Sequence, residues 1–280
     1  MLGAGTLFRP GIHQPLTELQ LSCPDHLVLP VELIPALEPF PSTPTAAAAS
    51  FVGFGAAVHR VPRVPQPDSR QDGLARARVN GYWHRGLSGT RAEESWFKRE
   101  FGPENLVSRP RHGDSSDALA QAIVGKGVTG PIAEMEHFSC HFRRTTGLSS
   151  DTIVLRPRRY WTDDIEVTAE DLSVAGVNAR PCGGLVFLNA CGTQSVDAAA
   201  VSSVSRVLLQ SGRDAVITTW CDVPDDVAYV MSKLVYGALR AGASVAEALW
   251  IARCRLLLDE NNPLGLLYTA VGNGRYRLAN

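Results

Sequence analysis

The second half of the chain alternates short apolar segments with amphipathic ones, and this alternation constrains the fold more than any other feature. A short apolar run that is rich in β-branched residues and bounded by polar or turn residues is typical of a buried strand. Such strands are expected at 131–139, 184–189, 215–220 and 266–271.

Between these segments, apolar residues recur at the three- and four-residue spacing of amphipathic helices. The clearest helix is expected at 225–240, with Gly242 just past its end. Two others are expected at 197–210 and 244–259, and Ser244 begins the second of them with a capping box. Because strands alternate with helices, we expect an α/β fold with a mostly parallel sheet that is covered on both faces.

The first half of the chain is richer in Pro, Arg and short polar stretches. The runs 27–34 and 51–61 are apolar and strand-like, and a helix is expected at 114–124. The sequence between 63 and 112 is polar, and there we expect a long surface loop that carries a short helix near 93–100.

Length and charge indicate an ordinary globular domain. Hydrophobic residues make up 45% of the 280 residues, which allows a sizeable core. The net charge is -1 and no basic run is interleaved with aromatic residues, so we expect no direct binding to nucleic acid or to a membrane. We expect a single domain over 1–280, with an N-terminal part at 1–130 and a core at 131–280 that carries the candidate chemistry.

The six cysteines lie far apart and form no CxxC pair, which is typical of reduced thiols. No segment is long and apolar enough to span a bilayer, and the N-terminus lacks the pattern of a secretory signal. We therefore expect a cytoplasmic protein.

Two of the expected strands end in reactive side chains. One leads through Cys140 to His141, and the other leads to Cys191, 50 residues later (191 − 141 = 50). This separation leaves room for a crossover between adjacent parallel strands, whose carboxyl ends meet at the same edge of a sheet. An imidazole at that edge can deprotonate a thiol, and backbone amides after the strand can stabilise an oxyanion. The pair therefore has the groups that acyl transfer needs.

The alternative for a cysteine in an apolar run is a small buried side chain. We expect that role for four of the cysteines, and alternation along a strand points Cys140 away from the face of His141. From the residues alone, both interpretations remain open for Cys191. The four cysteines are Cys23, Cys182, Cys221 and Cys254.

A metal or nucleotide site is not expected. His137, Cys140 and His141 are close in sequence, but His137 and Cys140 would face opposite sides of a strand. No second Cys/His pair completes a ligand set, and no glycine-rich phosphate-binding motif is present. We therefore expect no cofactor.

The motifs around the two reactive residues resemble those of CHAT domains, a caspase-like family of cysteine peptidases related to caspases and separase. The run 190–193 (Ala-Cys-Gly-Thr) resembles the family's catalytic cysteine turn. The run 137–142 resembles its histidine strand, in which the second histidine, His141 here, is the base. The resemblance extends over 29–273, with further similar segments at 29–33, 212–220 and 244–253.

The resemblance implies a caspase-like three-layer sandwich and a cysteine endopeptidase with Cys191 as nucleophile and His141 as base, without a metal or organic cofactor. It also implies that the backbone amides of Phe142, Cys191 and Gly192 hold the oxyanion. The family usually has glycine at the position of Phe142, and phenylalanine resists the positive φ that glycine allows.

Several relatives cleave after Arg or Lys and hold that side chain with a carboxylate. Trp220 ends an expected strand and Asp222 follows it, so these two are the candidate residues of a substrate pocket. Asp225 and Asp226 could supply the carboxylate as well, although acidic residues also suit the first turn of a helix, and we favour that role for Asp226.

The resemblance also implies partners. We expect a protein substrate and an activating regulatory protein or sensor domain, within a bacterial defence or signalling pathway. Two alternatives stay open. One is a catalytically impaired caspase-like module that binds a partner, which Phe142 favours, and the other is a thiol hydrolase or acyltransferase for small molecules.

Overall fold

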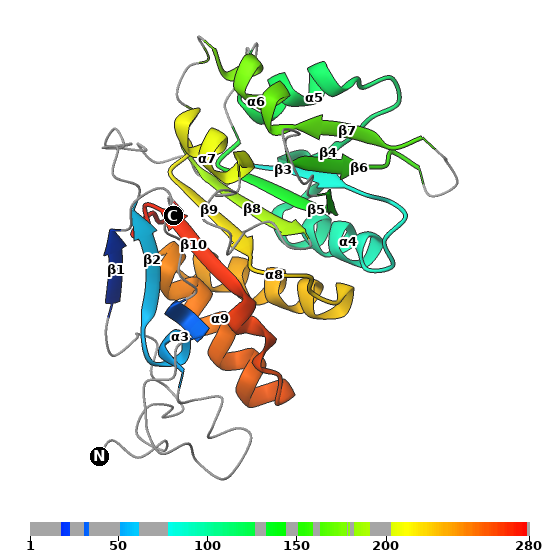
Figure 1. Cartoon of the computed structure of the whole chain (residues 1–280). Coiled ribbons are helices and arrows are strands. Elements are labelled where there is room, and N and C mark those ends of the chain that lie inside the picture. The colour runs from blue at the N-terminus through cyan, green and yellow to red at the C-terminus, as the bar shows by residue number, and fades with distance from the viewer. Residues whose placement is uncertain are drawn as a thin grey trace, which may run out of the picture.

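The computed structural model shows a mostly parallel sheet between two layers of helices (Figure 1). It describes residues 18–22, 31–33, 51–61, 78–126, 133–143, 151–158, 163–177, 179, 182–190 and 203–278. The strands are β1 (Glu18–Ser22), β2 (Ala57–Val61), β3 (Val79–Trp83), β4 (Leu106–Arg109), β5 (Met135–Arg143), β6 (Thr152–Leu155), β7 (Ile165–Thr168), β8 (Leu185–Ala190), β9 (Ala215–Thr219) and β10 (Tyr268–Gly272). The α-helices are α3 (Val52–Gly55), α4 (Thr90–Phe101), α5 (Ser116–Ile123), α6 (Ala169–Gly176), α7 (Ser203–Gln210), α8 (Asp225–Arg240) and α9 (Val245–Glu260). Short 3₁₀ helices are η1 (Val31–Leu33), η2 (Pro103–Asn105) and η4 (Pro263–Leu267).

Within the described residues, the main path of the sheet has the strand order β1-β2-β10-β9-β8-β5-β3-β4. Neighbouring strands on this path are parallel, except for β9 and β10, which are antiparallel. β6 pairs antiparallel with the end of β5, and β7 pairs antiparallel with β6. The strands β8 and β5 therefore lie in the middle of the sheet, where their carboxyl ends can form a site.

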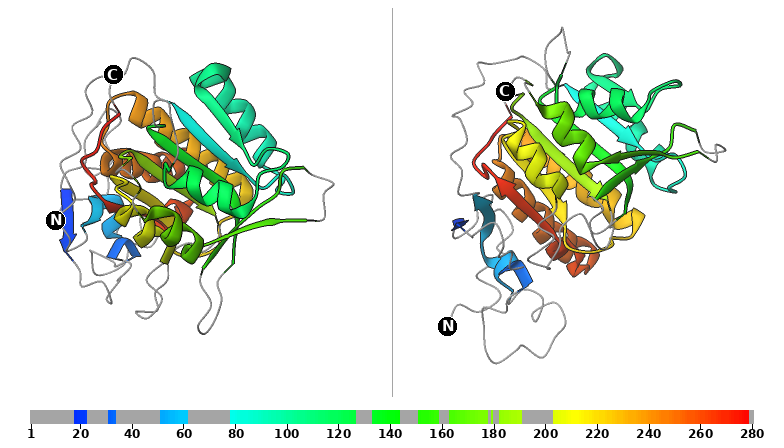
Figure 2. Two further views of the ribbon diagram at one scale, coloured as in Figure 1. Left: turned by 90° about the horizontal axis from the view of Figure 1, so that it is seen from above. Right: turned by 45° about the horizontal axis from the view of Figure 1, so that its top comes forward.

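Alternation along the strands sends side chains into two helical layers. In β8, Leu185 and Phe187 pack with α4, α8 and α9, whereas Val186 and Leu188 pack with α5, α6 and α7. The views in Figure 2 show helices on both sides of the sheet. A strand that is buried on both faces needs apolar residues throughout, as this one has. The prediction of an α/β three-layer sandwich with a mostly parallel sheet is confirmed.

The helices α8 and α9 begin where local signals predict them. α8 covers the predicted range 225–240. Before α9, the hydroxyl of Ser244 accepts a hydrogen bond from the backbone N–H of Glu247, whose carboxylate accepts one from the backbone N–H of Ser244. α7 begins at residue 203, and the earlier part of its predicted range, 197–202, lies outside the described residues.

The first half differs from the prediction. The surface loop expected at 63–112 is wrong for 78–112, which fold into β3, α4, η2 and β4, although the short helix expected near 93–100 is confirmed as part of α4. Val79, Trp83 and Phe97 from this range are fully buried in the core. The polar residues of the range obscure this core role because their partners come from distant segments of the chain.

Two apolar runs upstream also differ from the prediction. The strand expected at 27–34 is wrong for Val31–Leu33, which form η1, and the rest of that run lies outside the described residues. In the run 51–61, α3 precedes β2. The reason is a tertiary contact, because buried Phe54 packs against Trp250 of α9, whose indole N–H donates to the carbonyl of Phe54 at 2.8 Å.

None of the helices in the described part of the chain is long and apolar enough to cross a membrane.

Candidate functional site

The carboxyl ends of β5 and β8 lie side by side. The two strands pair in parallel over six residues, the last pair being Cys140 and Ala190. His141 follows in β5 and is exposed, whereas Cys140 is buried, as predicted for neighbours on opposite faces of a strand. Cys191 and Gly192 follow Ala190 in the sequence and lie outside the described residues.

The strand β5 continues past His141. His141 lies opposite Val154 of β6, and Phe142 lies opposite Ile153. The prediction that this strand ends at residue 139 is therefore wrong, because the buried strand β6 pairs with the residues that follow. Phe142 is partly buried against the core on the α5–α7 side, and its φ is not positive.

A second histidine, His84, contacts His141. Their ring centroids are 4.4 Å apart with an interplanar angle of 70°, which is an edge-to-face contact. His84 follows β3 and is buried. Its backbone N–H donates to the carbonyl of Ser139 at 2.7 Å, and its carbonyl accepts from the hydroxyl of Thr90 at 3.1 Å. These bonds fix the backbone at His84 to β5 and to the start of α4.

Asp164 and Arg156 extend this contact into a row of polar groups. Nε2 of His84 lies 3.4 Å from Oδ1 of Asp164, and the same oxygen accepts a hydrogen bond from Nε of Arg156 at 2.6 Å. The hydrogen bond from Arg156 lowers the pKa of Asp164 below its usual range, with a smaller contribution from His84. Asp164 is therefore ionised near neutral pH.

Burial lowers the pKa of His84, and the charge of His141 lowers it further, whereas Asp164 partly opposes both effects. His84 is therefore neutral near pH 7. Neither ring nitrogen of His84 has a hydrogen-bond partner of normal geometry within the described ranges. Buried polar atoms without a partner are costly.

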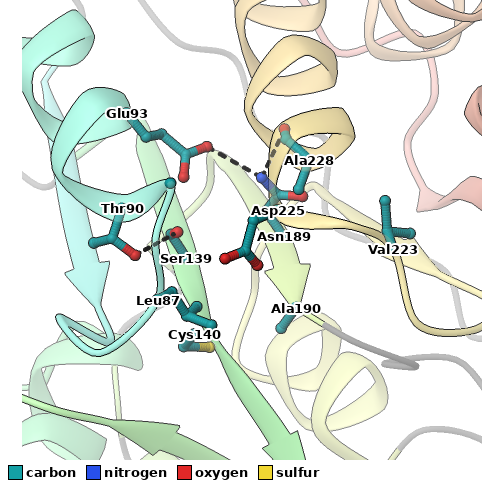
Figure 3. A pocket seen from close by; sticks show the side chains of 11 residues that line it. Leu87, Thr90, Glu93, Ser139, Cys140, Asn189, Ala190, Val223, Asp225 and Ala228 are labelled. Atoms are coloured by element: carbon teal, nitrogen blue, oxygen red, sulfur yellow. Dashed lines mark hydrogen bonds between the residues drawn. The ribbon is translucent and has the colours of Figure 1, made fainter.

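A pocket opens at the ends of β5 and β8, between the starts of α4 and α8 (Figure 3). Its polar lining includes two carboxylates, and none of the described residues that line it is basic. The pocket therefore has a negative character. The polar lining residues are Thr90, Glu93, Ser139, Asn189 and Asp225, and the others are Leu87, Gly89, Cys140, Ala190, Val223 and Ala228.

Asn189 connects four elements behind this pocket. Its Nδ2 donates to Oε1 of Glu93 at 3.1 Å and to the carbonyl of Ala228 at 3.0 Å (Figure 3). Its Oδ1 accepts from the hydroxyl of Tyr268 at 2.8 Å. These bonds tie α4, β8, α8 and β10 together at the pocket wall.

Glu93 also faces His137. Its Oε1 lies 3.1 Å from Nε2 of His137, whose Nδ1 lies 3.2 Å from the hydroxyl of Tyr236. Burial alone would raise the pKa of Glu93, but the charge and hydrogen-bond interactions with His137 outweigh it and the pKa is lowered. His137 lies on the α4 and α8 side of the sheet and Cys140 on the other side, as predicted for their positions in the strand. The described residues hold no cluster that could bind a metal.

Glu94 holds the segment that carries His84. Its carboxylate accepts from both terminal nitrogens of Arg85 at 2.5 and 3.1 Å, and from the hydroxyl of Ser108 at 2.8 Å. Burial would raise the pKa of Glu94, but these partners and Lys98 lower it to about 2. Because Arg85 directly follows His84, this ion pair anchors the chain beside the histidine contact to α4.

The pocket residues expected from the sequence occupy different positions. Trp220 is buried and Asp222 is exposed, and neither lines the pocket. Asp225 does line it, and its Oδ2 accepts from the backbone N–H and the hydroxyl of Ser88 at 3.1 and 2.8 Å. Asp226 lies in the first turn of α8, as expected for an acidic residue near a helix N-terminus.

The other cysteines lack the surroundings of a nucleophile. Cys182 and Cys254 are buried as predicted, and burial raises the pKa of both thiols, to about 12 for Cys254. The prediction of burial is wrong for Cys221, which is exposed in the bend after β9, and desolvation still raises its pKa. Thiols with a raised pKa react slowly as nucleophiles. Cys23 lies outside the described residues.

Sequence reasoning missed His84 and Asp164. It named Asp225 among three candidate carboxylates, and Asp225 is the one of the three that lines the pocket. His84 follows Trp83 at the end of a strand, which is the same signal that singled out His141. Asn80 and Gly81 inside β3 obscured that strand. For Asp164 the sequence holds no signal, because it meets His84 only through the pairing of β6 and β7.

Comparisons with known proteins are consistent with this architecture. The model of the CHAT domain matches residues 39–268. No curated protein matches the chain. Two structures of the Saccharomyces cerevisiae separase–securin complex, at 2.6 and 3.0 Å resolution, contain a similar chain, with 13% and 14% identity and TM-scores of 0.44 and 0.46. Each match covers 80% of this chain and only 14% of the solved chain. Since the family model spans most of the sequence, the chain belongs to the CHAT domain family.

Proposed function

We propose that this protein is a cysteine peptidase in which Cys191 is the nucleophile and His141 is the base. The observation that carries the proposal is the parallel register of Cys140 with Ala190. His141 and Cys191 are the next residues along the two neighbouring segments. In the sequence, Cys191 comes two positions after Asn189, which lines the pocket.

In the proposed reaction, His141 takes the thiol proton of Cys191, and the thiolate adds to the carbonyl carbon of a peptide bond. The C–N bond then breaks, and the amine leaves with the proton that His141 returns. A water molecule, deprotonated by His141, attacks the resulting thioester. The carboxylate product leaves and the thiol of Cys191 is restored.

The backbone amides of Cys191, Gly192 and Phe142 are the proposed oxyanion donors. Phe142 is a strand residue opposite Ile153, so the ladder between β5 and β6 fixes its backbone. This departs from the glycine that is usual in the family. It is the observation that favours the second candidate function, a catalytically impaired module that binds a partner.

We propose that the pocket receives the substrate side chain that precedes the cleaved bond, and that it prefers Lys or Arg. Glu93 already interacts with His137 and Asn189, so Asp225 is the carboxylate that can meet a cationic side chain. Asp222, the pocket residue expected from the sequence, is exposed outside this lining.

Several expectations about the biology remain predictions. These are a protein substrate, activation by a regulatory protein or sensor domain, a place in bacterial defence or signalling, a cytoplasmic location, and one domain over the whole chain. The charged pocket at the strand ends supports a peptide substrate, because a polypeptide offers both the cleavable amide and a cationic side chain.

The test is mass-spectrometric mapping of new protein N-termini in a cell lysate incubated with the wild type, with Cys191→Ala and with His141→Ala. New termini that follow Lys or Arg are expected with the wild type alone. The same termini with Cys191→Ala would refute the assignment of the nucleophile. Their absence from all three samples would favour the interaction module.

A further inference from the structure

We propose that His84 is a positioning residue that orients the imidazole of His141 for proton transfer from Cys191. In this proposal, Asp164 and Arg156 hold His84 in place. The inference rests on the proposed function, because it assigns a role in the use of the same nucleophile and base.

The rings of His84 and His141 are in contact. His141 is exposed, and an exposed side chain can exchange among several rotamers. His84 is buried, and its ring meets that of His141 edge to face with 4.4 Å between centroids. A restrained ring in contact with a free one limits the orientations that the free ring can adopt.

The surroundings of His84 restrain its ring. A Cβ atom at Gly86 would lie 2.7 Å from Cε1 of His84 and 3.1 Å from Nη1 of Arg156. The ring therefore packs closely against the backbone of the turn after β3. The ion pair of Arg85 with Glu94 and the backbone bond to Ser139 hold that turn against α4 and β5.

The choice of histidine at this position also has a cost. Phenylalanine would pack there without that cost, because both nitrogens of His84 are buried without a hydrogen bond of normal geometry within the described residues. The ionised carboxylate of Asp164 lies 3.4 Å from Nε2. It favours the tautomer that carries its proton there, which leaves Nδ1 as an acceptor.

A neutral imidazole with a free acceptor suits a position beside the catalytic base. When His141 takes the thiol proton it becomes a cation with two N–H donors. In this proposal, the exposed ring of His141 changes its orientation so that Nδ1 of His84 accepts one of them. His84 would then orient and stabilise the cation, as the aspartate does in a Ser-His-Asp triad. A carboxylate would do this more strongly, so the effect expected here is moderate.

The proposal can be tested without a substrate or an activator, by alkylation of Cys191. The rate of its reaction with iodoacetamide is measured by peptide-resolved mass spectrometry from about pH 5 to about pH 9, because the thiolate is the reacting form. The samples are the wild type, His141→Ala, His84→Phe and Asp164→Asn. The exposed Cys221 is the internal control, and its rate should be the same in all four.

His141→Ala should give Cys191 the pH profile of an ordinary thiol. His84→Phe keeps the size and the edge-to-face contact but removes both nitrogens. It should lower the alkylation rate at about pH 6.5 roughly tenfold, which corresponds to a profile moved by about one pH unit. Asp164→Asn should move the profile in the same direction by a smaller amount.

The outcomes separate the two proposals. A changed profile in His141→Ala together with a wild-type profile in His84→Phe would overturn the role of His84 and leave the Cys191–His141 pair intact. An unchanged profile in His141→Ala would overturn the pair, and the role of His84 with it. Should His84→Phe not fold, as shown by thermal unfolding, Gly86→Ala takes its place. This substitution keeps His84 but displaces its ring, and an unchanged profile there would also overturn the proposal.

Discussion

Cys140 of β5 lies opposite Ala190 of β8 in a parallel ladder. Each is followed in the sequence by one of the two residues proposed for acyl transfer, His141 and Cys191. Neighbouring strands lie about 4.8 Å apart, which supports the proposal that the two residues act together. The register thus connects a sequence pattern to a proposed reaction.

Under the proposed function, the charge of the pocket predicts a preference for substrates with a cationic side chain before the cleaved bond. Asp225→Asn should reduce cleavage after Arg, because the pocket then lacks the partly exposed carboxylate of its lining. The ratio of kcat/KM for peptides that carry Arg or Gln before the cleaved bond should fall about tenfold. Asp222→Asn is the control and should keep the wild-type ratio. The same ratio in Asp225→Asn would remove this residue from the pocket.

The hydrogen bonds of Asn189 predict a large loss of stability when they are removed. Asn189→Leu leaves the carboxylate of Glu93, the hydroxyl of Tyr268 and the carbonyl of Ala228 each without one buried bond. Urea unfolding should show a free energy of unfolding lower by about 3 kcal/mol. Tyr268→Phe removes one of these bonds and should cost about 1 kcal/mol. Equal costs for the two variants would show that the shared network contributes little.

The lowered pKa of Glu94 predicts a stability that depends on pH. Its value in the folded protein is about 2 against an ordinary 4.5, so the ionised form is favoured by folding. This contribution is fully present above pH 4.5 and is lost as the pH falls toward about 2. Glu94→Gln should therefore cost roughly 2–3 kcal/mol at neutral pH, and the cost should shrink steadily below pH 4.5.

The control for Glu94 is an ion pair on the surface. Glu100 accepts a hydrogen bond from Arg240 at 2.6 Å, but both side chains are more than one-third exposed. Glu100→Gln should change the free energy of unfolding by less than about 1 kcal/mol at any pH. A cost for Glu94→Gln that stays constant between neutral and acid pH would contradict the assignment of the pKa.

The sequence predicted the elements that carry their own local signal. The apolar runs of β8 and β9, the periodicity of α8 and the capping box at Ser244 each act within a few residues. Register is different, because it depends on which strands are neighbours in the sheet. Strand-end reasoning predicted that His141 and Cys191 share one edge of the sheet, and the pairing of β5 with β8 adds the register of the residues that precede them.

The strands of the segment 78–112 were missed because the buried polar residues of this segment have hydrogen-bond and ion-pair partners only in the folded protein. Glu93 of α4 lies 3.1 Å from His137 of β5, and Asn80 of β3 donates to Glu136 of β5 at 3.0 Å. Read without these partners, such residues indicate an exposed loop. His84 was missed for the same reason, because its contact with His141 joins two residues that are 57 positions apart in the sequence (141 − 84 = 57).

The central claim is that Cys191 attacks carbonyl compounds with help from His141. The most direct measurement is covalent capture by a peptidyl acyloxymethyl ketone that carries Arg, in which the thiolate displaces the carboxylate and leaves a thioether. Intact mass and peptide mapping then locate the modified residue in the wild type and in His141→Ala. The account predicts one modification at Cys191 in the wild type, formed at least about tenfold more slowly in His141→Ala. An unmodified Cys191, or equal rates in the two proteins, would contradict it.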